Sequence, residues 1–233
     1  MLSKKPVLYQ KITTILLDLD DTLIDHKSAE IRASSLFGRQ YKTFIPDYEP
    51  ENFTERWHQE ARPFMKAFLE GKISFQEQRR MRLEAVLGRE NMDADEADAI
   101  FNDYLKHYEA SWQLFPDVRS FLENHSHYRL AVISNAEQTQ QEAKLDRTGI
   151  RDFFELVLTA ESAGMAKPDP RIFHHACRLL KVKPERACCI GNNLENDVIG
   201  ANEAGLRGVW LNRSEKPVPE GIEAISSLEN FRL

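Results

Sequence analysis

The length of this chain, 233 residues, is enough for one large core or for a core that carries a smaller insert. Its 37 acidic and 31 basic side chains give a formal charge of -6, so it lacks the basic excess of proteins that bind nucleic acid polymers. The apolar runs are too short to span a bilayer, and the first residues show no secretory signal. We therefore expect a cytoplasmic protein with neither a nucleic acid nor a membrane partner, and no pattern indicates its oligomeric state.

The number and positions of the cysteines indicate a protein of a reducing compartment. There are three of them, an odd count, and Cys188 and Cys189 are adjacent in a segment that we interpret as a buried strand. Free cysteine is among the most frequently buried residue types. We expect small apolar side chains in the core here, rather than a redox switch.

Short apolar runs without polar alternation predict strands that are covered on both faces. Stretches with helical periodicity follow several of them, at residues 137–147, 170–180 and 195–204. Strands that alternate with helices predict an α/β fold with a doubly wound, Rossmann-like parallel sheet. The predicted strands are residues 12–17, 130–133, 156–158, 187–190 and 208–211, with a weaker one at 224–228.

The alternation of strands and helices is interrupted at residues 24–115, because this interval contains no convincing strand and is rich in helix-forming residues. The first predicted strand precedes it and the other strands follow it. The simplest organisation is an α/β core domain of residues 1–23 and 116–233 with an inserted helical cap domain at 24–115. Predicted cap helices are residues 27–41, 54–70 with a kink at Pro63, 74–87 and 94–109.

Polar residues stand where the predicted strands end. Ligands of open α/β sheets bind beyond the carboxyl ends of the strands, so these residues are the candidates for a functional site. They are Asp18, Asp20 and Thr22 after the first strand, Ser134 and Asn135 after the second, Lys167 before the helix at 170–180, and Asn192 and Asp197 after the fourth strand.

This set of groups fits phosphoryl transfer through an aspartyl-phosphate. One carboxylate attacks phosphorus, and a second protonates the leaving oxygen and then activates water. A divalent cation and a lysine offset the charge on the phosphoryl oxygens. Oxygen ligands favour magnesium over zinc, and no His or Cys cluster has zinc-like spacing.

Four ordered segments resemble the motifs of the haloacid dehalogenase superfamily. They are DLDDTLID at 18–25, SNA at 134–136, KPDPRIF at 167–173 and GNNLENDVIGANEAGL at 191–206. The insert resembles the C1-type helical cap, and GLRGVWLNRSEKP at 205–217 is similar to the branch with pyrimidine 5'-nucleotidases and N-acylneuraminate-9-phosphatases. The resemblance implies a Mg²⁺-dependent phosphomonoester hydrolase acting on a small phosphorylated metabolite, with nucleoside 5'-monophosphates favoured.

The resemblance also implies a role for each candidate residue. Asp18 is expected to be the nucleophile and a Mg²⁺ ligand. Asp20 is expected to be the general acid and base, and to bind the metal through its main-chain carbonyl. The remaining expectations are phosphate binding by Ser134, Asn135 and Lys167, support of the nucleophile loop by Thr22, metal binding by Asn192, and metal binding through water or orientation of Lys167 by Asp197.

Asn192 departs from the family pattern, because most phosphatases of the family have Asp directly after the glycine of the fourth motif. Asparagine still offers a carbonyl oxygen, but the lost negative charge weakens metal binding. We therefore expect an active enzyme with a raised magnesium requirement. A catalytically weak protein that binds a phosphorylated ligand stays open as an alternative.

Two further reactions stay open. A metal-independent 2-haloacid dehalogenase has a similar asparagine-containing fourth motif. Asp20 argues against this reaction, because a departing halide needs no acid. A phosphomutase of the same cap class would differ from a hydrolase only in its product.

Overall fold

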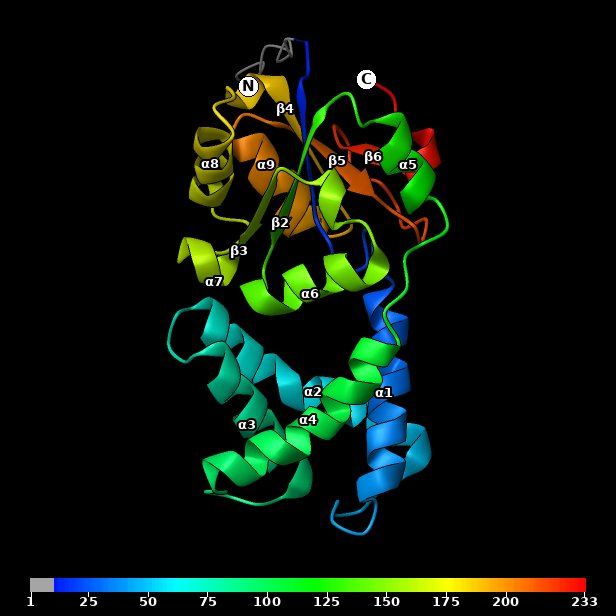
Figure 1. Cartoon of the computed structure of the whole chain (residues 1–233), viewed down its shortest axis with the longest axis vertical. Coiled ribbons are helices and arrows are strands. Elements are labelled where there is room, and N and C mark those ends of the chain that lie inside the picture. Colours follow the sequence, from blue (N-terminus) through cyan, green and yellow to red (C-terminus); the bar gives the residue numbers. More distant parts are fainter. Residues whose placement is uncertain (1–10) are drawn as a thin grey trace. The chain divides into compact units, whose positions relative to one another are not determined.

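The structure is a computed structural model that describes residues 11–233 (Figure 1). Residues 1–10, in which the sequence shows no secretory signal, lie outside the described part. The chain divides into two compact units, one formed by Met1–Ile24 with Leu114–Leu233 and the other by Asp25–Gln113. In the described residues the first unit is α/β and the second contains helices without strands.

The α/β unit is built on a six-stranded sheet with the order β3-β2-β1-β4-β5-β6. All five neighbouring pairs are parallel. The order changes direction between the adjacent strands β1 and β4, which makes this pair the topological switch point. The predicted fold class is confirmed. The strands are β1 (Thr14–Leu17), β2 (Arg129–Ser134), β3 (Leu156–Thr159), β4 (Ala187–Gly191), β5 (Arg207–Leu211) and β6 (Glu223–Ile225).

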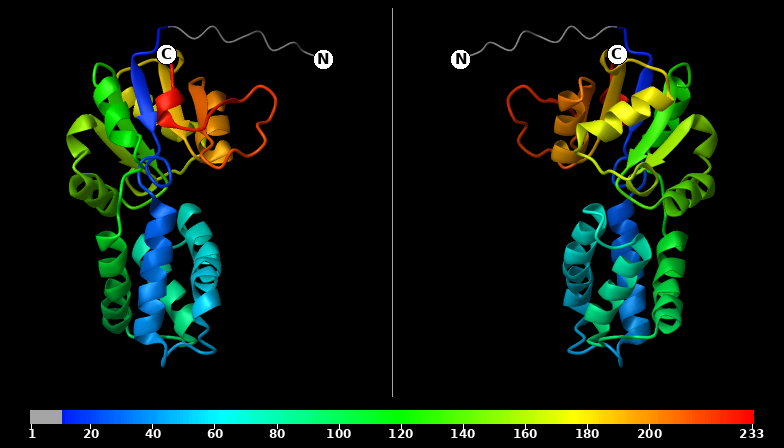
Figure 2. Two further views of the ribbon diagram at one scale, coloured as in Figure 1. Left: turned by 90° about the vertical axis from the view of Figure 1, so that its right-hand side faces the viewer. Right: turned by 90° about the vertical axis from the view of Figure 1, so that its left-hand side faces the viewer.

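Helices cover both faces of this sheet (Figure 2). On one side lie α5 (Val118–Asn124) and α6 (Gln138–Thr148), and on the other lie α8 (Pro170–Leu179) and α9 (Gly200–Glu203). Shorter segments complete the unit. They are α7 (Ala160–Ala163), a π-helical turn at Leu194–Ile199 that runs into α9, and 3₁₀ turns at Arg151–Phe153, Pro184–Arg186 and Leu228–Asn230.

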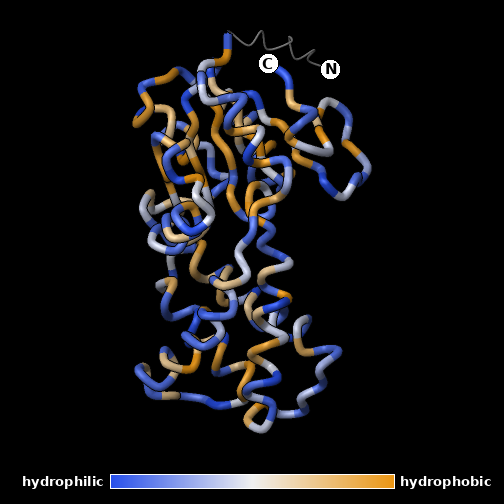
Figure 3. The backbone as a smooth tube through the Cα atoms, turned by 45° about the vertical axis from the view of Figure 1, so that its right-hand side comes forward, coloured by the Kyte–Doolittle hydropathy of each residue, from blue (hydrophilic) through white to orange (hydrophobic). Residues whose placement is uncertain are grey.

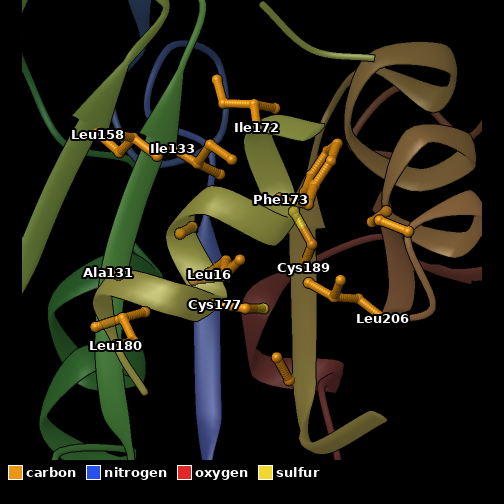
Figure 4. Close-up of a cluster of buried hydrophobic side chains, with 14 residues drawn as sticks. Leu16, Ala131, Ile133, Leu158, Ile172, Phe173, Cys177, Leu180, Cys189 and Leu206 are labelled. Atoms are coloured by element: carbon orange, nitrogen blue, oxygen red, sulfur yellow. The ribbon is translucent and has the colours of Figure 1, made fainter. Parts of the chain in front are cut away.

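A hydrophobic cluster fills the space between the sheet and α8 (Figure 4). Leu16 of β1 and Cys189 of β4 belong to it together with Phe173 and Cys177 of α8, and none of the four is more than 2% exposed. The neighbouring strand residues point to the opposite face, where Ile15 is also fully buried. Burial on both faces explains why the strands form uninterrupted apolar runs, which Figure 3 shows as hydrophobic stretches of the core. All three cysteines are free and buried, and the predicted burial of Cys188 and Cys189 is confirmed.

The helical unit has four helices with clear local signals at their ends. Asp25 accepts a hydrogen bond from the Ser28 N–H and so caps the first helix. Ser74 and Glu77 form a capping box, and Gly88 ends that helix with a φ of +61°. The helices are α1 (His26–Tyr41), α2 (Pro50–Leu69), α3 (Phe75–Leu87) and α4 (Ala94–Ala110).

Aromatic residues form the core of this unit. Trp57 is fully buried, stacks on Phe101 and packs against the tilted rings of Phe37 and Tyr104. Phe53 is also buried, whereas Phe44 is 64% exposed. Packing among the helices therefore occupies the central cap aromatics, as a small helical unit requires.

A partly buried charge cluster adjoins that aromatic core. The Glu30 carboxylate lies 3.2 Å from His26 and 3.2 Å from His58, and 3.7 Å from the Arg82 guanidinium. Arg82 in turn lies over the Trp57 ring at 4.2 Å. The cluster joins α1, α2 and α3 through one carboxylate.

Several predicted boundaries differ from the structure. The helix predicted from residue 54 begins at Pro50, because proline is tolerated in the first turn, and it continues through Pro63. The helix predicted at 195–204 is split into the π-helical turn and α9. No helix in residues 11–233 is both long enough and apolar enough to cross a bilayer.

Candidate active site

A cavity of about 180 Å³ lies at the carboxyl ends of β1, β2 and β4. These strands surround the switch point, where an open α/β sheet binds its ligand. All candidate residues from the sequence except Thr22 line the cavity. Its lining is Asp18, Asp20, Ser134, Asn135, Lys167, Asn192, Asn193, Asn196 and Asp197.

Lys167 stands at the centre of the charged groups. Its ammonium donates to the Asp18 carboxylate at 2.7 Å, to the Asp197 carboxylate at 2.6 Å and to the Ile133 carbonyl at 2.8 Å. An ammonium group has three donors, and all three are used here. The lysine is thus fixed beside the predicted nucleophile, and Asp197 orients it.

One lysine shared by two buried carboxylates leaves an excess of negative charge. Burial and the Asp197 carboxylate raise the pKa of Asp18 more than the Lys167 ammonium lowers it, and the resulting pKa is about 7. Burial lowers the pKa of Lys167, but Asp18 and Asp197 outweigh burial and raise it. The site is therefore electrostatically prepared for a further cation next to Asp18.

The second oxygen of Asp18 is held by Thr22, whose hydroxyl donates to it at 2.8 Å. The same hydroxyl accepts a hydrogen bond from the Asn192 N–H at 3.1 Å, and the Asn192 carbonyl accepts one from the Trp210 indole at 2.9 Å. Thr22 is fully buried behind the cavity. It therefore supports the loop of Asp18 and links that loop to the fourth motif.

Gly191 permits the close approach of Asp197. A Cβ atom at Gly191 would lie 2.3 Å from the Asp197 carboxylate, closer than non-bonded atoms approach. The Asp197 carboxylate also accepts the Asn193 N–H at 2.9 Å. Glycine is required here because the carboxylate occupies the space of a side chain.

Asn135 contacts the backbone of Lys167, and its predicted phosphate contact stays a prediction. Its amide donates to the Lys167 carbonyl at 2.7 Å and accepts from the Lys167 N–H at 2.7 Å. These contacts fix the backbone of the lysine while Asn135 still lines the cavity. In this structure the side chain positions Lys167.

Asp20 is held from the side of α6. Its carboxylate accepts a hydrogen bond from the Lys144 ammonium at 2.6 Å and one from the Gln141 amide at 2.8 Å. The Gln141 amide also donates to the Ser134 hydroxyl at 2.7 Å. Gln141 and Lys144 were not among the predicted site residues, although a lysine on the buried stripe of the helix predicted at 137–147 is a signal for such a role.

The possible metal ligands are oxygen atoms. Within residues 11–233 no three His, Cys, Asp or Glu side chains are grouped to hold a metal. The donors near the excess negative charge are the Asp18 carboxylate and the side-chain carbonyl of Asn192, with the main-chain carbonyl of Asp20 at the same loop. An all-oxygen set with few carboxylates suits Mg²⁺, which keeps several water ligands.

The family model of haloacid dehalogenase-like hydrolases matches residues 12–205. The chain belongs to this family. The resemblance read from the four motifs is confirmed at the level of the family. The match extends from β1 to the segment after α9, so it includes every element that supplies a cavity-lining residue.

Relatives within the family carry phosphatase names. The pyrimidine 5'-nucleotidase YjjG of Escherichia coli is 35% identical over 108 residues, which are 44% of this chain and 48% of the nucleotidase. The phosphoserine phosphatase of Thermus thermophilus is 29% identical over 230 residues, with 87% of this chain and 90% of the phosphatase covered. The chain thus spans about half of the nucleotidase and nine tenths of the phosphatase.

Solved structures of the family have the same fold. The HAD-hydrolase YfnB of Bacillus subtilis, determined with magnesium bound, superposes with a TM-score of 0.78 at 26% identity, covering 94% of this chain and 96% of that one. A 2-haloacid dehalogenase of Pseudomonas syringae gives a TM-score of 0.68 at 27% identity, with coverages of 93% and 95%. Proteins similar to this chain are therefore named both as a phosphatase and as a dehalogenase, and the residues of the site must distinguish these reactions.

Proposed function

We propose that this protein is a Mg²⁺-dependent phosphomonoester hydrolase that acts on small phosphorylated metabolites through an aspartyl-phosphate on Asp18. The observation that carries the proposal is the pair Asp18 and Asp20. Lys167 adjoins the first carboxylate, and Gln141 and Lys144 hold the second. The two carboxylates have separate partners, as two separate roles require.

In the first step, one carboxylate oxygen of Asp18 attacks phosphorus and forms a new oxygen–phosphorus bond. The bond between phosphorus and the ester oxygen breaks, and Asp20 gives that oxygen its proton. Ser134 stands at the cavity wall to contact a phosphoryl oxygen, and the positive charge of Lys167 lies at the same wall to offset the charge on the phosphoryl group. The products are the free alcohol and the phosphorylated Asp18.

In the second step, water attacks the phosphorus of the aspartyl-phosphate. Asp20, now a carboxylate, takes a proton from that water, and the bond to Asp18 breaks. Inorganic phosphate leaves and both carboxyl groups return to their starting state. Thr22 and Lys167 keep Asp18 in the same position throughout, because each contacts a different oxygen of its carboxylate.

Asp18, Asn192 and the main-chain carbonyl of Asp20 would hold Mg²⁺. When bound, the metal supplies positive charge that stabilises the phosphoryl oxygens in the transition state. The donor chemistry fits, and the negative charge that Lys167 leaves uncompensated favours a cation. The magnesium in the similar YfnB structure supports the choice of metal.

For the substrate, we infer a small phosphate monoester, and nucleoside 5'-monophosphates are the first class to test. The similarity to a pyrimidine 5'-nucleotidase supports that class. Relatives named for phosphoserine and glyceraldehyde 3-phosphate support the broader one. The site itself recognises the phosphoryl group, which all of these esters share.

The second candidate function is a metal-independent 2-haloacid dehalogenase, which the similar Pseudomonas syringae structure and Asn192 favour. Asp20 weighs against it. A halide leaves without a proton, so a dehalogenase needs no general acid. The carboxylate of Asp20, which two donors hold in the cavity wall, would have no role in that reaction.

The test is phosphate release from a panel of nucleotide and sugar monoesters, with Mg²⁺ present or chelated and with Asp18→Asn as the blank. Magnesium-dependent release that Asp18→Asn abolishes supports the proposal, and the preferred ester defines the substrate class. Halide release from 2-haloacids without metal, with no phosphate release, would replace it by the second candidate.

A further inference from the structure

Helix α6 directs two polar side chains into the interior of the α/β unit. Lys144 is 1% exposed and Gln141 is fully buried, and both contact Asp20. Asp20 itself is different, because its side chain is 23% exposed and lines the cavity. Two buried donors thus hold one carboxylate from behind while its other side faces the cavity.

This arrangement is a poor way to stabilise the fold. A buried lysine gives up its hydration, and replacing a buried ion pair by apolar residues of similar size is often neutral or stabilising. Leu145, the next residue on the same helix, is an apolar side chain that packs fully buried. A lysine at position 144 therefore needs an explanation beyond packing.

Neither donor belongs to the cavity wall. The lining includes Asp20 and Ser134, and Gln141 and Lys144 lie behind these two residues. The Gln141 amide donates one hydrogen to Asp20 at 2.8 Å and the other to Ser134 at 2.7 Å. Gln141 therefore fixes the distance between the carboxylate and the hydroxyl, whereas Lys144 fixes the other oxygen of Asp20 at 2.6 Å.

We propose that Gln141 and Lys144 are positioning residues that orient Asp20 toward the ester oxygen and align it with the phosphoryl contact at Ser134. This inference rests on the proposed phosphohydrolase function. The pair acts through Asp20 and Ser134 and touches no substrate. Each oxygen of Asp20 accepts one hydrogen bond from the pair, so the two donors together define the plane of the carboxylate.

If the pair orients the general acid, the loss of activity in a variant depends on the leaving group of the substrate. If the pair only supports the fold of the site, the loss is the same for all leaving groups. An alkyl alcohol is a poor leaving group and needs a proton from Asp20, whereas p-nitrophenolate leaves without one. A displaced acid therefore harms the first substrate class more than the second. General acid catalysis contributes about 10²–10⁴-fold in rate, and that contribution is what misorientation of Asp20 removes.

The experiment compares kcat/KM for an alkyl phosphate and for p-nitrophenyl phosphate in the full-length wild type, Lys144→Met and Gln141→Met. The ratio kcat/KM reports the steps up to release of the alcohol. The control is Arg147→Met, which removes the same charge from an exposed position of α6. Thermal unfolding monitors the fold, and crystal structures of the wild type and of Lys144→Met show the side chain of Asp20.

We expect kcat/KM for the alkyl phosphate to fall about 100-fold in Lys144→Met, and its ratio to the aryl value to fall at least about tenfold. Arg147→Met keeps both values. The midpoint of unfolding of Lys144→Met stays within about 4 °C of the wild type, because the remaining partner, Asp20, is 23% exposed at its side chain and can be hydrated. In the crystal structure of Lys144→Met, Asp20 leaves its orientation while Asp18 and Lys167 stay in place.

Equal losses for the two esters, or no loss, overturn the proposal, and so does an unchanged Asp20 in the variant structure. If Lys144→Met does not fold, the same comparison of the two esters in Gln141→Met decides the proposal. Failure of the proposed function is a different result, in which the wild type hydrolyses neither ester. The crystal structures then still decide whether Lys144 orients Asp20.

Discussion

Replacing Lys167 by methionine should destabilise the α/β unit strongly, because the lysine is the cation between two buried carboxylates. Asp18 is 7% exposed and Asp197 is 1% exposed, and the ammonium lies within 2.7 Å of both. Removing one partner of a buried ion pair costs about 3–5 kcal/mol, since the other charge stays buried without compensation. For a chain of this size, that cost lowers the midpoint of thermal unfolding by roughly 6–20 °C.

The assay is calorimetric and urea unfolding of the wild type, of Lys167→Met and of two controls. Lys144→Met removes a lysine whose partner, Asp20, is 23% exposed at the side chain, so its cost should be much smaller. Lys167→Met combined with Asp197→Asn should recover part of the stability, because one uncompensated charge is then gone. A loss below about 1 kcal/mol in Lys167→Met, or no recovery in the double variant, would refute the reasoning.

Three further changes have defined outcomes. Asn192→Asp should lower the magnesium concentration for half-maximal phosphate release, because it restores a carboxylate donor; an unchanged magnesium titration contradicts this. Burial raises the pKa of Glu30, but His26, His58 and Arg82 together outweigh burial and hold that pKa well below its usual 4.5. The ionised carboxylate therefore stabilises the helical unit above about pH 4.5, and this contribution is lost as the pH falls through the lower folded-state pKa. The difference in unfolding midpoint between the wild type and Glu30→Gln should be present at pH 5.5 and shrink toward pH 3, and a constant difference contradicts it. Gly191→Ala should abolish phosphate release and lower the unfolding midpoint, because its Cβ would lie 2.3 Å from the Asp197 carboxylate; wild-type activity would show that Asp197 is free to move.

The sequence was sufficient to predict the sheet and the meeting of Asp18, Ser134, Lys167 and Asn192 at one cavity. Strands buried on both faces leave continuous apolar runs, and the carboxyl ends of parallel strands lie at one edge of the sheet. Asp18, Ser134 and Asn192 stand at the ends of such runs, so topology alone brings them together, whereas Lys167 comes from the segment before α8. The cavity lining contains these four residues.

The contacts behind the cavity could not be predicted in this way. Gln141 and Lys144 meet Asp20 across 121 and 124 residues, because α6 packs against the sheet in one particular orientation. Asn135 turns to the Lys167 backbone for the same reason, since its partner lies 32 residues away. Helix α5 was missed because its seven residues are too few to show a clear period.

The covalent intermediate is the most direct test of the central claim. Asp20→Asn removes the base of the second step, so enzyme mixed with Mg²⁺ and p-nitrophenyl phosphate and then quenched in acid should accumulate a phosphorylated form. Mass spectrometry of its peptides should find one phosphoryl group, on Asp18, and none in the Asp18→Asn, Asp20→Asn double variant. A phosphoryl group on another residue, or nitrophenolate release without any phosphorylated enzyme, would contradict attack by Asp18.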